Sequence, residues 1–374
     1  MMSRKLPEVC EIQYGFPFDS SLFSAEGDLP LIRIRDVVRG YTETYTSEKC
    51  DVAYLVHEGD ILVGMDGVFN VAKWKGEPAY LNQRVCRIIP NETIDADFLF
   101  YFIPTALKKI ENETAFVTVK HLKAKQLNAV VVPDVPIEEQ KKIAAQLNVI
   151  THLISLRQQQ AEKLDELVKA RFVEMFGDPI SNPHAFARVP LSELAVIKIG
   201  PFGSLLHKED YVHGEHALIN PSHITNGKIV IDENLTVSDE KYIELEAYQL
   251  RPGDVVLGRR GEMGRCAVVE REGYLCGTGS LLIRTNGQVT ADYIQKTISF
   301  PAYKRMIEDM AVGQTMQNLN VPIVSKFPIV KPPLDVQKRY YHFAHEIDCE
   351  KERIQKSAAL LETLKRSLMQ QYFG

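Results

Sequence analysis

The chain has 374 residues, of which 45% are hydrophobic and 25% charged, and its formal net charge is −5. This composition is typical of a folded globular chain long enough for two domains, and it excludes fibrous and intrinsically disordered proteins. No apolar run approaches the length of a membrane span, and the N-terminus has no signal-peptide core, so a cytoplasmic protein is expected.

Six cysteines are spread along the chain without the close pairs that bind zinc. Because a cytoplasmic protein keeps such thiols reduced, we expect free and buried cysteines, with neither a disulfide framework nor a metal site. The six are Cys10, Cys50, Cys86, Cys266, Cys276 and Cys349.

Residues 1–136 predict a first domain of mixed α and β structure, because short apolar segments alternate with turns rich in Gly, Asn and Asp. Its loops combine glycine with polar or charged neighbours, as in Gly15–Ser20, Gly64–Gly67 and Asn82–Arg84. The predicted strands are Leu31–Ile34, Ile61–Val63, Val85–Ile89 and Ala129–Val132.

Residues 137–177 predict one long helix, since neither Gly nor Pro interrupts Ile137–Phe176. A preceding proline, an acidic first turn and a final glycine suit its two ends. At a rise of about 1.5 Å per residue it spans roughly 60 Å, too long to fold back on one small domain. Apolar residues recur every three or four positions, with Arg157 in one slot, as in a coiled coil. This stripe contains Ile143, Leu147, Ile150, Ile154, Ala161, Leu164 and Val168.

Residues 178–333 predict a second domain of the same kind, and residues 334–374 predict a second long helix. The stripe of this helix has Lys351 in one slot. The predicted strands are Val255–Leu257, Leu281–Ile283 and Phe327–Val330, and the glycine-containing loops are Gly200–Ser204, Gly258–Arg265 and Gly277–Ser280. The stripe contains Tyr340, Ala344, Ile347, Ile354, Ala358 and Leu361.

The two halves of the chain are copies of one another. Residues 118–177 align without a gap on residues 315–374, with 12 identities in 60 positions, where unrelated sequences give about three or four. Upstream segments align with gaps, so that Gly64 matches Gly258 and Gly15 matches Gly200. We interpret this as a duplication in which two domains of one fold have diverged mainly in their loops.

Two long helices, each following its own domain, predict an α+β protein in which the helices pack as an antiparallel coiled coil with pseudo-twofold symmetry. The repeated domains would then lie at opposite ends of a helical rod. The alternative is that each helix packs only on its own domain.

The glycine-containing loops allow two interpretations. Glycine lets a backbone approach a polyanion, while Arg, Lys, Asn, Gln and Ser contact phosphates and base edges. Alternatively, the loops are tight turns with solvated charges. Three such loops recur at matching places in both domains with different neighbours, which favours one scaffold that reads two different targets.

Sequence motifs of common enzymes are missing. The chain has no phosphate-binding loop, no dinucleotide fingerprint, no zinc-protease motif and no serine elbow, so an enzyme is not expected. Asn220–His223 only partly matches the Asn-Pro-Pro-aromatic motif of DNA amino-methyltransferases, because it lacks the second proline and the aromatic ring.

Taken together, these features resemble the specificity subunit of type I restriction-modification enzymes over essentially the whole chain. Two variable domains are present, the second with Gly-Pro-Phe-Gly-Ser near its start, and each is followed by a Pro-x-x-x-Gln-Lys helix that runs to Leu-x-x-Leu and Phe-Gly. The first domain departs from this pattern at Phe16–Asp19. The resemblance implies two target recognition domains, each reading one half of a bipartite double-stranded DNA sequence.

The resemblance also implies partners and cofactors. The helices would fix the unread spacer between the half-sites, two methylation subunits would dock around them, and restriction subunits would join the full complex. The chain itself would be non-catalytic and hold no cofactor, while S-adenosylmethionine, ATP and magnesium would bind to the partner subunits. The net charge of −5 is unusual for a protein that neutralises phosphates, but the distribution of charge sets the local field.

Polar and basic residues of the aligned loops are the predicted DNA contacts. Arg259, Arg260 and Arg265 are expected to contact phosphates or guanine. The predicted contacts of the first domain are Ser20, Ser21, Asp66, Asn70, Lys73, Asn82, Gln83, Arg84, Lys120 and His121. Those of the second domain are Ser204, His207, Lys208, Arg259, Arg260, Arg265, Thr278, Ser280, Gln317 and Asn318.

Two other functions stay open. A self-contained DNA methyltransferase or nuclease would need a cofactor or metal site in this chain. A protein-only coiled-coil scaffold would assemble its partners without any dependence on DNA.

Overall fold

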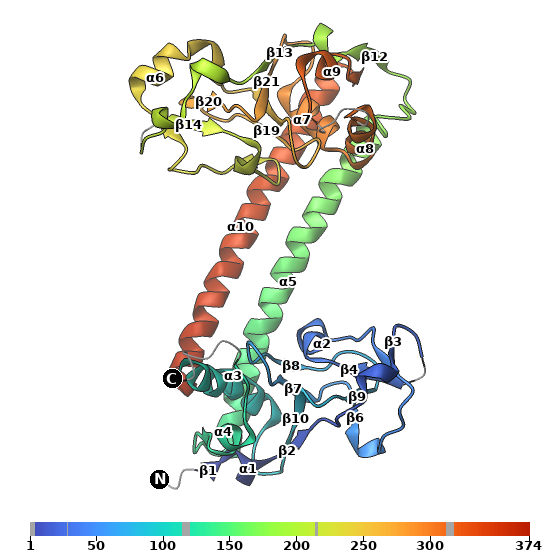
Figure 1. Cartoon of the computed structure of the whole chain (residues 1–374), viewed down its shortest axis with the longest axis vertical. Helices are drawn as coiled ribbons and strands as arrows, with labels where there is room; N and C mark the ends of the chain where they lie inside the picture. The colour runs from blue at the N-terminus through green and yellow to red at the C-terminus, as the bar shows by residue number, and fades with distance from the viewer. Residues whose placement is uncertain (1–3, 28, 114–119, 214–215, 312–317) are drawn as a thin grey trace. The chain divides into compact units, whose positions relative to one another are not determined.

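The computed structural model describes residues 4–27, 29–113, 120–213, 216–311 and 318–374. Its contacts divide the chain into a first unit, Met1–Gln160 with Ile354–Gly374, and a second unit, Ala161–Arg353. Each unit holds a β-rich domain together with parts of the two long helices α5 (Ile137–Phe176) and α10 (Leu334–Phe373) (Figure 1). The fold is α+β, as predicted.

The first unit is built on an antiparallel four-stranded sheet in the order β2-β10-β7-β8, beside a sheet in the order β3-β5-β4-β9-β6 and a short β1-β11 pair. Its strands are β1 (Arg4–Lys5), β2 (Cys10–Tyr14), β3 (Phe23–Ser24), β4 (Leu29–Ile32), β5 (Tyr45–Thr46), β6 (Leu55–Val56), β7 (Ile61–Gly64), β8 (Val71–Lys73), β9 (Ala79–Leu81), β10 (Val85–Pro90) and β11 (Val131–Val132). Its shorter helices are α1 (Leu6–Val9), α2 (Ile34–Arg39), α3 (Ala96–Glu113) and α4 (Ala124–Asn128), with 3₁₀ turns η1 (Ser20–Leu22) and η2 (Val52–Tyr54).

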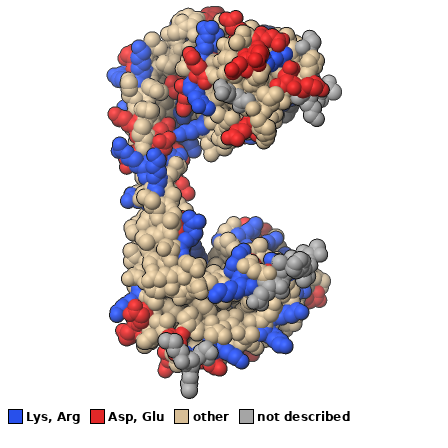
Figure 2. All heavy atoms as spheres, turned by 90° about the vertical axis from the view of Figure 1, so that its left-hand side faces the viewer, with Lys and Arg blue, Asp and Glu red and all other residues tan. Residues whose placement is uncertain are grey.

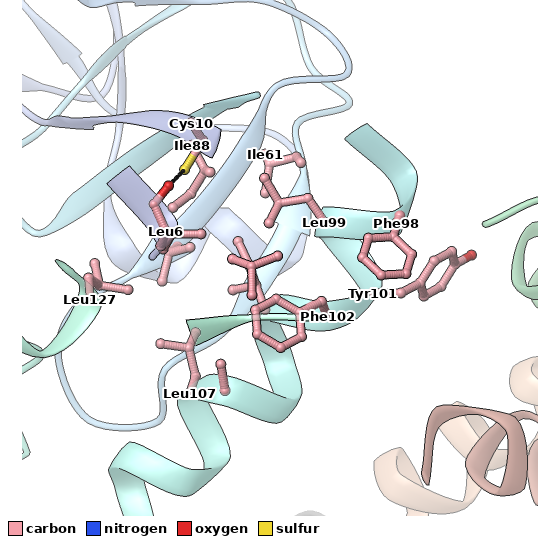
Figure 3. Packing of buried hydrophobic residues seen from close by; sticks show 14 of the residues in the cluster. Leu6, Cys10, Ile61, Ile88, Phe98, Leu99, Tyr101, Phe102, Leu107 and Leu127 are labelled. Carbon is pink, nitrogen blue, oxygen red and sulfur yellow. Dashed lines mark hydrogen bonds between the residues drawn. The ribbon is translucent and has the colours of Figure 1, made fainter. Parts of the chain in front are cut away.

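Helix α3 covers the four-stranded sheet and forms the core of the first unit with it. Phe98, Leu99 and Phe102 of α3 share one buried cluster with Ile61 of β7 and Ile88 of β10, and Figure 3 shows these side chains together. Alternation along the strands brings such residues to one face of the sheet, and burial of that face stabilises the domain.

The predicted strands of the first domain lie in or overlap β4, β7, β10 and β11. Ile34 is an exception, because it begins helix α2 rather than extending β4. The reason is local: the Asp36 carboxylate accepts a hydrogen bond from the Arg33 amide at 2.9 Å and so caps the helix start.

The second unit contains sheets in the orders β13-β21-β18-β19 and β17-β14-β20, with the pairs β12-β22 and β15-β16. Its strands are β12 (Ala187–Pro190), β13 (Ala195–Ile199), β14 (His216–Ile219), β15 (Ile224–Thr225), β16 (Lys228–Ile229), β17 (Thr236–Val237), β18 (Asp254–Gly258), β19 (Cys266–Val268), β20 (Tyr274–Cys276), β21 (Ser280–Thr285) and β22 (Pro328–Lys331). Its shorter helices are α6 (Asp239–Glu244), α7 (Ala291–Ser299), α8 (Pro301–Ala311) and α9 (Val321–Ser325), with 3₁₀ turns η3 (Leu191–Glu193), η4 (Gly203–Leu205), η5 (Lys208–Asp210), η6 (Pro221–His223) and η7 (Glu246–Tyr248). The three predicted strands of this domain lie in or overlap β18, β21 and β22.

The second unit repeats the main sheet of the first unit and the parallel strand pair beside it. Its sheet β13-β21-β18-β19 matches β2-β10-β7-β8, and the parallel pair β14/β20 matches β4/β9. The register is also repeated, because Gly64 pairs with Val85 in the first unit and Gly258 pairs with Ser280 in the second. The duplication seen in the sequence therefore extends to the hydrogen-bond register of the sheets.

Helices α5 and α10 pack together and run in opposite directions. In the second unit, Lys351 Nζ donates to the Asp165 carboxylate at 2.6 Å, and the Tyr340 hydroxyl donates to the Val168 carbonyl at 3.4 Å. In the first unit, the Tyr372 hydroxyl donates to Gln146 Oε1 at 3.1 Å. Lys351, the polar member of the predicted stripe, thus has an acidic partner on the other helix.

The predicted stripe residues are buried or half-buried in both helices. Those classed as buried are Ile143, Leu147, Ile150, Ile154, Tyr340, Ala344 and Ile354, and those half-buried are Ala161, Leu164, Val168, Ile347, Ala358 and Leu361. The alternative that each helix packs only on its own domain is wrong, although the first turns do so, since Ile143 and Leu147 join the core under α3.

A buried glutamine fixes the start of each long helix against its domain. Gln140 is fully buried; its Oε1 accepts from the Asp95 amide at 2.9 Å and its Nε2 donates to the Val135 carbonyl at 2.7 Å. Gln337 makes the same two bonds to the Thr290 amide and the Pro332 carbonyl, at 2.9 and 2.8 Å. The glutamine of the repeated motif therefore has a structural reason, because each side-chain amide satisfies a buried donor and a buried acceptor.

The far end of each long helix packs into a core beside the start of the other helix. Phe176, at the end of α5, is 2% exposed and contacts Phe172 and Tyr340 within the second unit. Phe373, at the end of α10, is 4% exposed and contacts Phe98 within the first unit. These aromatic contacts explain why the last helical residue of both repeats is phenylalanine.

All six cysteines are free thiols. Burial raises the pKa of Cys10, Cys86 and Cys276 to about 12 and that of Cys266 to about 11, whereas Cys349 is exposed. Within the described ranges, His, Cys, Asp and Glu form no cluster that could hold a metal ion. In the same part of the chain, every helix is too short or too polar to cross a bilayer.

Candidate nucleic-acid interface

Three segments of the first unit are joined by backbone hydrogen bonds at one end of the four-stranded sheet. They are residues 65–70 between β7 and β8, residues 82–84 between β9 and β10, and residues 120–122 before α4. The Met65 amide donates to the Arg84 carbonyl at 3.0 Å, and the Leu122 amide donates to the Met65 carbonyl at 2.7 Å. We call these segments the loop frame of the first unit.

Charged side chains gather on this frame. His121 Nδ1 lies 2.5 Å from Asp66 Oδ1, and Arg84 Nε lies 3.5 Å from Asp66 Oδ2. The frame therefore brings together Asp66, Arg84 and His121, three of the predicted contacts that are separated in sequence. Gln83 is exposed beside them, while Asn82 is 8% exposed and accepts from the Gln83 amide at 2.8 Å.

Other predicted residues of the first domain have structural partners. The Lys73 ammonium pairs with Asp97 of α3, on the helix that covers the sheet. Lys120 Nζ donates to the Glu111 carbonyl at 3.2 Å, and Asn70 accepts at its carbonyl from the Gly64 amide at 2.8 Å. Ser20 and Ser21 are exposed in η1, with Ser21 bonded to Asp19.

The second unit has the same loop frame, made of residues 259–265, 277–279 and 318–320. The Arg259 amide donates to the Gly279 carbonyl at 2.9 Å, and the Leu319 amide donates to the Arg259 carbonyl at 2.9 Å. Arg259 thus occupies the position of Met65, and Leu319 that of Leu122. The backbone of the frame is repeated although its side chains differ.

Gly15 follows β2 and Gly200 follows β13. At each of these glycines the chain passes close to the backbone of the loop frame, at Asn82 in the first unit and at Gly277 in the second. A Cβ on Gly15 would lie 2.1 Å from the Asn82 carbonyl oxygen, and one on Gly200 would lie 2.0 Å from the Gly277 carbonyl oxygen. Atoms cannot approach so closely, so only glycine fits at either place. At these two positions glycine is needed for the close approach of another part of the protein backbone.

The side chain of Arg259 ties the second frame together. Its Nε donates to the Leu319 carbonyl at 3.0 Å and its Nη1 donates to the Thr278 carbonyl at 3.3 Å. Partial burial, and then the neighbouring charge of Arg260, lower the pKa of Arg259. This arginine bridges all three segments of the frame.

Arg265 belongs to an ion-pair network inside the same loop. Its Nη2 donates to Glu262 Oε2 at 2.8 Å, and Lys304 of α8 donates to Glu262 Oε1 at 2.8 Å. Hydrogen bonds from Lys304 and Arg265 lower the pKa of Glu262 to about 2. Arg265 also donates to the Pro221 carbonyl at 3.3 Å, so it connects the loop to η6.

Arg260 lies on a pocket of about 360 Å³ at the surface of the second frame. Within the described residues, its exposed guanidinium has no hydrogen-bond or ion-pair partner. Phe202, which is 63% exposed, and Thr278 are on the pocket wall with it. The whole lining is Ile199, Phe202, Arg259, Arg260, Thr278 and Gly279.

The remaining predicted residues of the second domain are scattered around the frame. His207 is exposed, Asn318 is half-buried, and Ser280 is fully buried in β21. Gln317 lies outside the described residues, as do the side chains of Ser204 and Lys208. The predicted DNA contacts of both domains stay predictions. Some of these side chains are exposed on the loop frames, and others are bonded to the protein itself.

Asn220, which follows β14, is hydrogen-bonded to the second frame and was not among the predicted contacts. Its Oδ1 accepts from the Gly279 amide at 3.1 Å, and its own amide donates to His223 Nδ1 at 3.1 Å. The first unit repeats the second bond, from the Arg33 amide to Asp36. The segment Asn220–His223, which partly matches the methyltransferase motif, therefore holds a loop of this domain in place, a structural role that the sequence did not predict.

Acidic and basic side chains are interspersed on the visible faces of both units (Figure 2). The net charge of −5 therefore does not describe any one surface. Individual exposed cations such as Arg260 decide where a polyanion is attracted locally.

The chain is similar to several known proteins. Residues 1–166 match the family model described as the type I restriction modification DNA specificity domain. The type I restriction enzyme EcoBI specificity subunit of Escherichia coli is 28% identical over 292 residues, which are 71% of this chain and 62% of that protein. The chain thus spans less than two thirds of the length of that relative.

Two further similarities cover more of the chain. The MjaVIII specificity subunit of Methanocaldococcus jannaschii is 20% identical over 333 residues, which are 84% of this chain and 78% of that protein. The crystal structure of a type I restriction-modification system S subunit from M. genitalium matches with a TM-score of 0.61 and 16% identity, covering 100% of this chain and 96% of that one. The latter similarity concerns the fold alone.

Proposed function

We propose that this chain is a specificity subunit of the type I restriction-modification family and reads a bipartite DNA target with its two loop frames. Subunits of this family are non-catalytic, and no cofactor is expected in the chain. The proposal assigns one half-site to each domain, 1–136 and 178–333. Methylation and restriction subunits would supply the chemistry, with S-adenosylmethionine, ATP and magnesium.

One observation carries this proposal. The backbone hydrogen bonds of the loop frame are the same in both units, while the residues at matched positions differ, as with Asp66 and Arg260. A fixed backbone that presents variable polar side chains is what the reading of two different base sequences requires. A protein-only scaffold would not need this combination.

We assign the spacing of the half-sites to the paired helices. Both helices are continuous over 40 residues, and Asp165–Lys351 with Tyr340–Val168 sets their register. Readers held by helices of fixed length select half-sites by distance and helical phase.

The methylation subunits would dock on the apolar surface of these helices. In the first unit, Val149 of α5 is 59% exposed and Leu360 of α10 is 72% exposed. A groove of about 540 Å³ is lined by Ala145, Gln146, Val149, Ile150 and Leu368. Exposed apolar surface of this kind on a helix pair is typical of a protein-binding site.

The main test is to co-express the chain with a candidate methylation subunit in a host without DNA methylation and to map N6-methyladenine over the genome. We expect one bipartite motif with a fixed spacer, absent when the chain is omitted. A stable complex that leaves the genome unmodified would contradict the proposed reading function. Modification by the chain alone would instead support a self-contained methyltransferase.

The spacer is tested by inserting one heptad after residue 160 of α5 and one after residue 353 of α10, where the division between the units falls. Seven residues add about 10 Å of helix, or about three base pairs. The motif should keep both half-sites and change its spacer. An insertion in α5 alone is the control, because it shifts the two helices out of register and should abolish the complex.

Docking is tested with Val149→Glu and Leu360→Glu, which place charges on the exposed apolar surface. Both should prevent co-purification of the methylation subunit, because a buried unpaired charge is costly at an interface. Gln159→Glu, at an exposed position of α5, adds the same charge elsewhere and should leave the complex intact. Equal binding by all three variants would place the docking surface elsewhere.

A further inference from the structure

We infer that Arg260 reads a guanine in the half-site of the second domain and that Phe202 shields this contact from water. The inference rests on the proposed function and goes beyond it by naming one reading residue and the base that it selects. Three arginines of the second frame are candidates in the sequence, and the structure separates their roles.

The side chains of Arg259 and Arg265 are hydrogen-bonded to other groups of the protein. Arg259 donates to two carbonyls of the frame, at 3.0 and 3.3 Å. Arg265 is bonded to Glu262 and to the Pro221 carbonyl. Reading a base with either residue would break bonds that hold the loop, whereas Arg260 has no such bond within the described part of the chain.

The loop presents Arg260 from a fixed backbone. The residue before it is hydrogen-bonded through both its amide and its carbonyl, to Gly279 and Leu319. Two residues further on, Glu262 is already neutralised by Lys304 and Arg265. The backbone beside Arg260 is therefore fixed, and the Glu262 carboxylate, which is already paired, does not compete for the Arg260 guanidinium, so this cation is available to a ligand.

The pocket beside Arg260 suits the edge of a base. Phe202 and Ile199 give it apolar walls, and Thr278 gives it a hydroxyl. A guanidinium can donate two hydrogen bonds to O6 and N7 of guanine, which is the most common specific contact in the major groove. An apolar wall that excludes water strengthens these bonds, because water no longer competes for the donors.

The first unit has a different side-chain arrangement at the same place. Asp66 occupies the position of Arg260, and it is held by His121 and Arg84. Arg84 in turn occupies the position of Gly279, the residue without a side chain in the second frame. The free cation is thus a property of the second frame, so its guanine requirement should appear in one half-site only.

The test maps the methylation motif of the complex with Arg260→Ala. We expect the second domain's half-site to lose its requirement for guanine at one position, by about tenfold to a hundredfold in the ratio of guanine to other bases. The other half-site and the spacer should be unchanged. Arg260→Lys keeps the charge without the planar fork, so it should relax the same position.

Arg251→Ala is the matched control. Arg251 is an exposed arginine that precedes β18, whereas Arg260 follows it, so the two lie at opposite ends of one strand. Loss of this charge should leave the motif unchanged. Phe202→Ala should weaken modification at the same half-site and leave the identity of the preferred base unaltered.

The outcomes separate the inference from the proposed function. If the unaltered chain directs no bipartite modification, the proposed function fails. If it does, but Arg260→Ala gives the same motif, the assignment of Arg260 is wrong. Lower modification at all sites by Arg260→Ala, restored by Arg260→Lys, would make Arg260 a phosphate contact and would also overturn the inference. A fall in thermal stability with Arg260→Ala would show that the residue is structural, with the same consequence.

Discussion

The loop frames of the two units share a backbone and differ in how their charges are used. In the first frame, Asp66 binds both His121 and Arg84, so acidic and basic groups are paired with one another. In the second frame, Arg259 and Arg265 hold the protein together and Arg260 is left exposed. The difference shows that the position of a charged residue in a loop does not reveal its role, because neighbouring carbonyls and carboxylates decide whether it is available.

The largest expected effect comes from removing the aromatic ends of the long helices. Phe176→Ala should reduce the free energy of unfolding of the second unit by about 3–5 kcal/mol, because the side chain is buried among Phe172, Tyr293 and Tyr340. Phe373→Ala should cost less, since two of its three aromatic neighbours, Phe102 and Tyr372, lie 6.0 and 6.4 Å away between ring centres. Urea unfolding, with hydrogen exchange to locate the loss, measures both; equal effects would contradict this ranking.

The next effect concerns the buried glutamines that join each domain to its helix. Gln337→Ala leaves the Thr290 amide and the Pro332 carbonyl without their partner, at about 1–3 kcal/mol for each unpaired group. Gln140→Ala should cost the same in the first unit, because the two bonds are repeated there. Gln337→Glu is a useful companion, since it keeps the acceptor and loses the donor. Unchanged urea midpoints for both alanine variants would show that water replaces the amides.

A smaller effect is expected where the strand passes the loop frame. Gly200→Ala places a methyl group against the Gly277 carbonyl and should cost about 1–3 kcal/mol while shifting the second frame. Modification should weaken at one half-site, and Gly15→Ala should do the same at the other. Gly253→Ala is an instructive control, because a Cβ there meets no atom within 4 Å and any cost comes from its positive φ. Full DNA modification by the complex with Gly200→Ala would mean that the loop frame can shift to accept the methyl group without losing its function.

The smallest expected effect concerns Glu262, an acidic residue of the second frame. Hydrogen bonds from Lys304 and Arg265 lower the pKa of Glu262 to about 2, so its contribution to stability is present above about pH 4.5 and is lost as the pH falls towards 2. Because the side chain is half exposed, Glu262→Gln should cost less than about 1 kcal/mol at pH 7. The difference in melting temperature between the two proteins should disappear near pH 2; a constant difference would exclude the ionic explanation.

Much of the fold was predictable because the two halves of the chain repeat the same order of domain and long helix. The helix of residues 137–176 has no breaking residue, and its copy shares Gln337 and Phe373 at matched places, so both helices were evident. The seven predicted strands lie in or overlap strands of the structure, but β9 was not among them. The parallel pairing of β4 with β9 was not predicted either, since strands of three or four residues carry no signal for direction. The sequence also places Ile34 at a strand end, where the Asp36 cap starts a helix instead.

The candidate site was less predictable, for a physical reason. Glycine-rich loops marked the correct segments, yet the bond from Asn220 to Gly279 joins residues far apart in sequence. Lys73 was grouped with the loops by its neighbours, whereas its partner Asp97 comes from α3. Whether a side chain is free depends on contacts between segments, and no local pattern of residue types contains that information.

The aromatic ends of the helices have a consequence for how the protein is made. Phe98 of the first unit packs against Phe373, which the ribosome adds only after the whole second domain has been synthesised. Phe176, in contrast, is already present when Tyr293 and Tyr340 emerge. The domain that is translated first therefore completes its core last, and until then its apolar surface depends on chaperones or on partial folding for protection from aggregation.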